Sequence, residues 1–285
     1  MRSRPSAKDR DFVTAGELAR MAESLTGRAL DVTFPIYGED ERGEPDLLGS
    51  CVLLLVGNAR FMVTAGHVFD LGATRAMAVG AAAGLLPIAG LPIRLRSVAS
   101  THAVDDRVDI GIFRLQHSAW EAIGVDHFVS SDELDLFTPV VARQTYTLVG
   151  FPNSLNRLAV AGSRISAAGY RMAGLECVRN AYDAERIDPD SHVMVGFDKK
   201  KMLAADGPRT APDLYGASGS GLWRFGRRLR TTSQPPKLAA IATEWHSRGL
   251  HRYILGTRIQ LIVEALAERY EDVAAFITDG MRPPL

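Results

Sequence analysis

The chain has few cysteines and no excess of charge of either sign. Its 285 residues include only Cys51 and Cys177, and 33 basic residues balance 33 acidic ones. One cysteine pair is too few for a disulfide-stapled secreted scaffold. Cys51 lies in an apolar run, which favours a buried free thiol. The zero formal charge argues against a nucleic-acid partner, because nucleic-acid binding usually needs a basic surface.

Long uninterrupted hydrophobic runs and metal-ligand motifs are also missing. The most apolar stretch, 76–93, contains Pro87, Pro92 and several glycines, so it is too broken for a membrane-spanning helix. Residues 1–11 are polar and charged with no apolar segment behind them, so no signal peptide is visible. No histidines and cysteines have the spacing of metal ligands. We therefore expect a cytoplasmic protein of bacterial type, with no membrane partner, metal or other cofactor.

Short apolar segments separated by turn residues dominate the chain. With 46% hydrophobic and 23% charged residues, it has the composition of an ordinary soluble globular protein. Gly57-Asn58-Ala59 is a hairpin candidate. Many short strands indicate antiparallel barrels rather than alternating strands and helices. The predicted strands are 32–36, 49–55, 60–64, 92–99, 108–115, 144–150, 158–169, 192–197, 220–225, 237–245 and 252–257.

Helical spacing of apolar residues occurs near the two ends of the chain. Residues 12–27 have this spacing, with Thr14 as a plausible N-cap, and predict a helical extension. Residues 258–266 predict a final helix, followed by a proline-containing tail. Residues 119–139 carry no strong strand signal and predict a connector between two domains.

Three short segments carry the chemistry of an activated nucleophile. They are Thr64-Ala65-Gly66-His67, Asp109-Ile110-Gly111-Ile112 and Gly216-Ala217-Ser218-Gly219-Ser220-Gly221. A serine hydroxyl needs an imidazole to take its proton, and the imidazole needs a carboxylate to orient it and stabilise its charged form. The order His, Asp, Ser is that of chymotrypsin-like enzymes and not that of the α/β-hydrolases.

Alternatives exist for two of the three side chains. Asp105 and Asp106 compete with Asp109, but apolar residues flank Asp109, and the role needs a half-buried carboxylate. Ser220 competes with Ser218 as the nucleophile. Glycines on both sides of Ser218 permit a sharp turn and a close approach of substrate to the backbone.

These three segments resemble the motifs of the trypsin-like (chymotrypsin-fold) serine peptidases, bacterial intracellular type. The resemblance extends in patches over residues 30–267. It implies an all-β fold of two six-stranded antiparallel barrels with an N-terminal helical extension and a C-terminal helix. The implied divisions are a helical extension (1–30), a first barrel with the histidine and aspartate (31–130), a second barrel with the serine plus the final helix (131–270), and a tail (271–285).

The resemblance also implies roles for individual residues. His67, Asp109 and Ser218 form the triad, and the amides of Gly216 and Ser218 form the oxyanion hole. Ala217 stands where animal zymogens have an aspartate that pairs with a newly cut N-terminus, so that activation route is not expected. The residues implied for the substrate pocket are Pro212, Asp213, Thr243, Glu244 and Trp245. Since Pro212 stands at the pocket base, the sequence does not establish cleavage after lysine or arginine.

We therefore expect a serine endopeptidase that hydrolyses protein or peptide substrates through an acyl-enzyme. A regulatory protein partner, acting on the N-terminal helix or on the long segment 170–215, suits a protease that works inside a cell. The alternative is a binding module on a catalytically silent peptidase fold.

Overall fold

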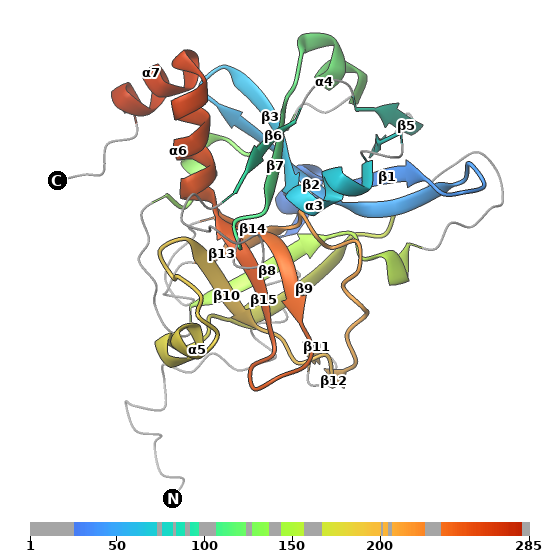
Figure 1. Cartoon of the computed structure of the whole chain (residues 1–285), viewed down its shortest axis with the longest axis vertical. Coiled ribbons are helices and arrows are strands. Elements are labelled where there is room, and N and C mark those ends of the chain that lie inside the picture. Colours follow the sequence, from blue (N-terminus) through green and yellow to red (C-terminus); the bar gives the residue numbers. More distant parts are fainter. Residues whose placement is uncertain are drawn as a thin grey trace, which may run out of the picture.

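Two antiparallel sheets make up most of the molecule, as the computed structural model shows (Figure 1). The all-β architecture is therefore confirmed. In Figure 1 the blue and green strands of the first sheet lie above the yellow and orange strands of the second. The structure describes residues 26–72, 76–81, 84–88, 92–96, 107–123, 127–136, 144–156, 167–200, 202–204, 207–225 and 235–280.

The first sheet has seven strands in the order β5-β4-β1-β2-β3-β7-β6, whereas the resemblance implied six and the sequence pattern located five. The two strands that the pattern missed form the β4–β5 hairpin, within a run of alanine, glycine and leucine that lacks the polar–apolar alternation of a half-buried strand. The strands are β1 Thr33–Glu39, β2 Pro45–Val56, β3 Ala59–Ala65, β4 Ala78–Ala81, β5 Gly84–Pro87, β6 Ile93–Leu95 and β7 Ile110–Arg114.

Strands β2 and β3 are buried on both faces, which explains their continuous apolar sequences. Successive side chains of a strand point to opposite faces. Val52 and Leu54 of β2 therefore join one core cluster, whereas Cys51 and Leu53 join another. The predicted hairpin is confirmed, since Val56 pairs with Ala59 across the turn.

The second sheet has six strands in the order β10-β15-β14-β13-β8-β9. Its ends approach each other through a bridge between Glu176 and Val195, which curls the sheet towards a barrel. A separate hairpin joins β11 (Met202–Ala204) to β12 (Gly207–Arg209). The six strands are β8 Thr145–Gly150, β9 Tyr170–Leu175, β10 His192–Gly196, β13 Gly221–Arg224, β14 Lys237–His246 and β15 Tyr253–Arg258.

Strand β9 lies later in the sequence than predicted. The prediction covered 158–169, of which 158–166 lie outside the described residues, and the strand runs over Tyr170–Leu175. Only Met172 of this strand is fully buried. An outer strand that buries one side chain carries little of the alternation on which the sequence prediction depends.

Six α-helices occur in the described ranges, and none of them is long and apolar enough to cross a membrane. The predicted helix at 12–27 lies outside these ranges except for its last two residues, which begin α2. A 3₁₀ turn at Ser131–Glu133 lies within the predicted connector (119–139), and helix α4 overlaps its start. The expected tail forms a second C-terminal helix, α7. The helices are α2 Thr26–Asp31, α3 Gly66–Gly72, α4 His117–Ile123, α5 Arg179–Ala184, α6 Ile259–Arg269 and α7 Glu271–Gly280.

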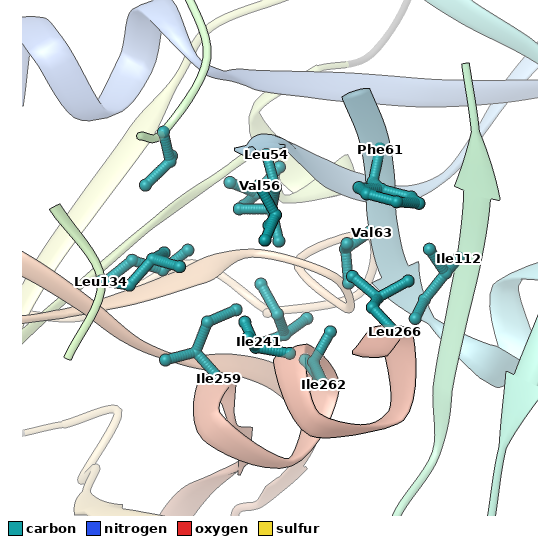
Figure 2. Close-up of a cluster of buried hydrophobic side chains, with 14 of the residues drawn as sticks. Leu54, Val56, Phe61, Val63, Ile112, Leu134, Ile241, Ile259, Ile262 and Leu266 are labelled. Atoms are coloured by element: carbon teal, nitrogen blue, oxygen red, sulfur yellow. The ribbon is translucent and has the colours of Figure 1, made fainter. Parts of the chain in front are cut away.

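Helix α6 closes a core that both sheets share. Its Ile259, Ile262 and Leu266 point into a cluster that contains Val63 of the first sheet and Ile241 of the second (Figure 2). This cluster fixes the two sheets relative to each other, which matters because the candidate site draws residues from both.

Candidate active site

His67 lies in the first turn of α3, directly after β3, and a glycine makes its position possible. The amide of Gly66 donates to the carbonyl of Asp109 at 2.8 Å. A Cβ at Gly66 would lie 2.3 Å from Asp109 Oδ1, closer than any real contact. The small residue before the histidine is therefore required by the approach of the carboxylate.

A second glycine brings α3 onto strand β7. A Cβ at Gly111 would lie 1.9 Å from the ring of Phe69, which is two residues beyond His67. The ring of Phe69 also makes an edge contact with Phe113, at 4.6 Å between centroids. The Asp-Ile-Gly-Ile segment thus supplies both the carboxylate and the flat surface against which α3 packs.

His67 and Asp109 form a hydrogen-bonded pair. The distance between His67 Nδ1 and Asp109 Oδ2 is 2.6 Å, and the His67 amide donates to the same oxygen at 3.2 Å. Since the carboxylate accepts from Nδ1, the ring keeps Nε2 available to accept a proton. Burial of Asp109 opposes its ionisation, but hydrogen bonds from His67 and the charge of Arg94 hold the pKa of this carboxyl below its ordinary value. Asp105 and Asp106 lie outside the described residues.

Ser218 lies in a tight loop between the two sheets. Gly216 and Gly219 have φ values of 85° and 90°, which few residues other than glycine adopt. A Cβ at Gly219 would lie 1.8 Å from the carbonyl oxygen of Ser50 and 2.2 Å from Thr64 Oγ1. The loop is therefore pressed against the end of β3, three residues before His67.

Ser50 of β2 holds this loop by its backbone. The Ser50 amide donates to the carbonyl of Ser218 at 2.8 Å, and Ser50 Oγ donates to the carbonyl of Gly216 at 2.9 Å. The same Oγ accepts from the amide of Phe151 at 2.9 Å. Both carbonyls on either side of Ala217 are thus bound by one buried residue of the first sheet.

The three candidate side chains do not all touch. Within the described part of the chain, no hydrogen bond joins the His67 ring to Ser218. The two segments meet instead around Gly49, where a Cβ would lie 2.7 Å from the Val68 side chain and 3.1 Å from the Ser218 carbonyl. The amides of Gly216 and Ser218, predicted as the oxyanion hole, donate to no acceptor among the described residues.

The alternative nucleophile, Ser220, is sealed inside the protein. It is 0% exposed, and a Cβ at Gly150 would lie 1.6 Å from its Oγ. A substrate cannot reach this hydroxyl without a rearrangement of β8 and the loop, whereas Ser218 lines an open pocket.

A pocket lies beside Ser218, and its roughly 210 Å³ of empty space includes open solvent. Three predicted residues line it, namely Thr243, Glu244 and Trp245, whereas Pro212 and Asp213 do not. The sequence analysis did not identify the other lining residues, because their apolar side chains look like any others of a strand or core. They are Leu148, Leu214, Ala217, Ala242 and Ile254.

The acidic groups near this pocket already have side-chain partners. Asp213 accepts from Lys199 at 2.5 Å. Glu244 contacts His246 Nε2 at 2.8 Å and Arg107 at 3.5 Å. Neither carboxylate is therefore an unpaired negative charge at the pocket. In the described ranges no three histidine, cysteine or acidic side chains gather as metal ligands would.

Comparisons with known proteins agree with this architecture. No protein-family model matches the chain, and no curated protein matches it. Neuropsin, a serine protease of mouse brain, has a similar structure, with a TM-score of 0.54, 13% identity, and coverage of 86% of this chain and 96% of that one. A structure of the Sesbania mosaic virus VPg protein has a TM-score of 0.47 and 11% identity, and covers 83% of this chain and 90% of that one.

The likeness to neuropsin shows that this chain has the chymotrypsin-like fold of serine proteases. At 13% identity it shows the fold alone. The activity has to be argued from the site.

Proposed function

We propose that the chain is a serine endopeptidase of the trypsin-like class. The observation that carries the proposal is the hydrogen bond of 2.6 Å between His67 and Asp109, two residues that are 42 positions apart. His67 follows the end of β3 against which the Ser218 loop is pressed, and Ser218 itself lines a pocket.

The proposed reaction follows from these positions. Ser218 Oγ attacks the carbonyl carbon of a peptide bond, and its proton passes to His67 Nε2. The resulting oxyanion accepts from the amides of Gly216 and Ser218. His67 then protonates the departing amine as the C–N bond breaks. Water, deprotonated by His67, attacks the ester, and the acid product leaves with Ser218 restored.

The missing His67–Ser218 hydrogen bond is compatible with this mechanism. Such contacts are often long without substrate and tighten in the complex. Ser50 holds the loop backbone against the first sheet, and we expect the Ser218 and His67 side chains to approach each other when substrate binds. Activation by a protein partner stays a prediction, and it fails if the purified protein cleaves generic peptides by itself.

Reaction with a fluorophosphonate tests the nucleophile. We expect labelling of Ser218 in the natural chain, none in Ser218→Ala, and a loss of at least about 100-fold in rate in His67→Ala, since the base contributes about that much or more. Ser220→Ala is the matched control and should keep its labelling. Labelling that persists in Ser218→Ala contradicts the assignment of the nucleophile, whereas a natural chain that takes no label supports the silent binding module.

The pocket supports a preference for apolar residues before the cleaved bond. Five aliphatic side chains line it, and the nearby carboxylates are paired with Lys199 and Arg107, with His246 as a further contact of Glu244. A lysine or arginine side chain would lose its hydration without gaining an unpaired partner.

Mapping of cut sites in a peptide library tests this preference. We expect cleavage after valine, leucine or alanine to exceed cleavage after lysine by at least about tenfold in kcat/KM. Ser218→Ala, which should produce no cuts, identifies background cleavage. A preference for lysine or arginine contradicts the role assigned to the pocket and leaves the proposed reaction intact.

A further inference from the structure

A cation that the sequence analysis did not identify lies against the carboxylate of Asp109. Arg94 belongs to β6, which pairs with β7, and faces Gly111 in that pairing. Its Nη2 donates to Asp109 Oδ1 at 3.3 Å. Its Nη1 donates to the carbonyl of Gly66 at 2.5 Å and to Asp70 Oδ1 at 2.7 Å.

Arg94 thus contacts three groups around His67. Gly66 precedes His67, Asp70 lies three residues after it on α3, and Asp109 is its carboxylate partner. A Cβ at Gly66 would lie 2.8 Å from both Nε and Nη2 of the guanidinium. The glycine before the histidine therefore makes room for Arg94 as well as for the carboxylate.

The carboxylate of Asp109 divides its two oxygens between two partners. Oδ2 accepts from His67, whereas Oδ1 accepts from Arg94. The side chains of Arg94 and Asp109 are each only 22% exposed, so solvent screens their interaction less than it would at the surface. A guanidinium keeps its charge at every pH at which proteins are stable. It therefore favours the ionised form of the Asp109 carboxyl, whose pKa lies below its ordinary value.

The other described charges near the pair are exposed or bound elsewhere. Asp70, on α3 itself, is bound to Arg94 and is 63% exposed, so its charge is well screened. On β14, Glu244 lines the Ser218 pocket and is bound to Arg107 and His246. Among the described residues, Arg94 is consequently the arginine that binds the Asp109 carboxylate.

We propose that Arg94 is a positioning residue of the site, which ties Asp109 to the first turn of α3 and stabilises the negative charge of its carboxylate. The consequence for catalysis rests on the proposed function, whereas the effect on the carboxylate does not. With Arg94 in place, the carboxylate that orients the His67 ring is held against α3 in its ionised form.

Titration of the Asp109 carboxyl by NMR tests the charge effect directly. The experiment uses the full chain carrying Ser218→Ala, which prevents self-cleavage, and Asp109→Asn identifies the signal. Arg94→Met should raise the midpoint of the Asp109 titration, because the neutral side chain no longer favours the ionised carboxyl. Arg94→Lys, which keeps the charge, should stay near the parent value. In active protein, kcat/KM should fall in Arg94→Met and recover in part in Arg94→Lys.

Two further variants separate charge from loosened packing. Arg114→Met removes an arginine that also binds a carboxylate, Asp272 at 2.7 Å, but at the contact with α7, and should leave the Asp109 midpoint unchanged. Arg94→Gln removes the charge but keeps hydrogen-bond donors, and should raise the midpoint as Arg94→Met does. Loosened packing alone does not raise the midpoint in both neutral variants while it spares Arg94→Lys.

An unchanged midpoint in folded Arg94→Met, or an equal rise in Arg114→Met, overturns the inference. If Arg94→Met does not fold, Arg94→Gln decides, and an unchanged midpoint there overturns it. If the expected shifts occur but Ser218 neither reacts with fluorophosphonate nor supports cleavage, the proposed function fails and the role of the Arg94 charge stands.

Discussion

Ser50 is fully buried, and its polar atoms contact three separate segments of the chain. It binds the carbonyls of Gly216 and Ser218, accepts from Phe151, and its own carbonyl accepts from Thr64 Oγ1 at 2.6 Å. The loop that carries the candidate nucleophile is therefore held by the first sheet, although it belongs to the second half of the sequence.

Ser50→Ala should weaken both the fold and the site. Removal of Oγ leaves the Gly216 carbonyl and the buried Phe151 amide without this partner, at a cost of about 1–3 kcal/mol in the free energy of unfolding. Urea unfolding measures this loss, and the rate of fluorophosphonate labelling should fall with it. Ser154→Ala, at an exposed hydroxyl bound to the Asp213 carbonyl, should change stability by less than about 0.5 kcal/mol. Equal effects of the two substitutions would contradict the role of Ser50.

Single glycines were the most informative residues in the sequence, and the structure explains why. Gly66, Gly111 and Gly219 each lie where a Cβ would collide with a named atom of another segment. A local motif can therefore report a tertiary contact without identifying its partner. Arg94, Phe69 and Ser50 are those partners, and nothing in their own sequence neighbourhood sets them apart from other strand or helix residues.

At the scale of elements, an ion pair joins α2 to the 3₁₀ turn at Ser131–Glu133. Arg28 binds both oxygens of Glu133 at 2.9 Å and also donates to the Phe128 carbonyl at 2.8 Å. Burial of Glu133 opposes its ionisation, but hydrogen bonds from Arg28 and Ser130 outweigh this and lower its pKa to about 2. The first described helix is thus attached to the connector between the two sheets.

The Arg28–Glu133 pair should make the free energy of unfolding depend on pH. Because the pKa of Glu133 is lower in the folded state, its contribution is complete above the ordinary glutamate value of about 4.3 and is lost as the pH falls towards 2. Glu133→Gln should remove this contribution, at most about 3 kcal/mol, since each unit of pKa shift corresponds to about 1.4 kcal/mol. Urea unfolding from neutral to acidic pH measures it. Glu268→Gln, at an exposed position of α6, is the control. The natural chain and Glu133→Gln should differ less in free energy of unfolding as the pH falls. If that difference does not shrink in acid, the pair does not have this role.

The strands that bury most of their side chains are the ones that the sequence located correctly. Strands β2 and β3 have continuous apolar runs because both of their faces are covered, and they appear where the sequence placed them. The β4–β5 hairpin and β9 bury few side chains, so their positions depend on backbone pairing with β1 and β8. Backbone pairing leaves little trace in a sequence.

At the scale of the whole molecule, one core cluster spans the division between the two barrels. It combines Val63 and Ile112 of the first sheet, Trp223 and Ile241 of the second, and the apolar face of α6. Neither half can bury these side chains alone, so the division at 130–131 does not separate two independent cores.

We expect the chain to unfold in a single cooperative transition. Far-UV circular dichroism and tryptophan fluorescence should give coincident urea curves, because loss of either sheet exposes the shared cluster. A fragment covering residues 26–136 should show no cooperative unfolding of its own, whereas the full chain should. Two resolved transitions, or a cooperatively folded fragment, would show that the halves are independent.

By itself the sequence determined the class of fold, the three short segments and the order of their side chains. Burial patterns, and the glycines that tight packing requires, can be recognised within short stretches of sequence. The tertiary structure decided which cation lies beside Asp109, which residue holds the Ser218 loop, and that the charges near the pocket are already paired. Each of these depends on the distance between residues that strand pairing and sheet packing bring together, and the separation of two residues along a chain does not determine that distance.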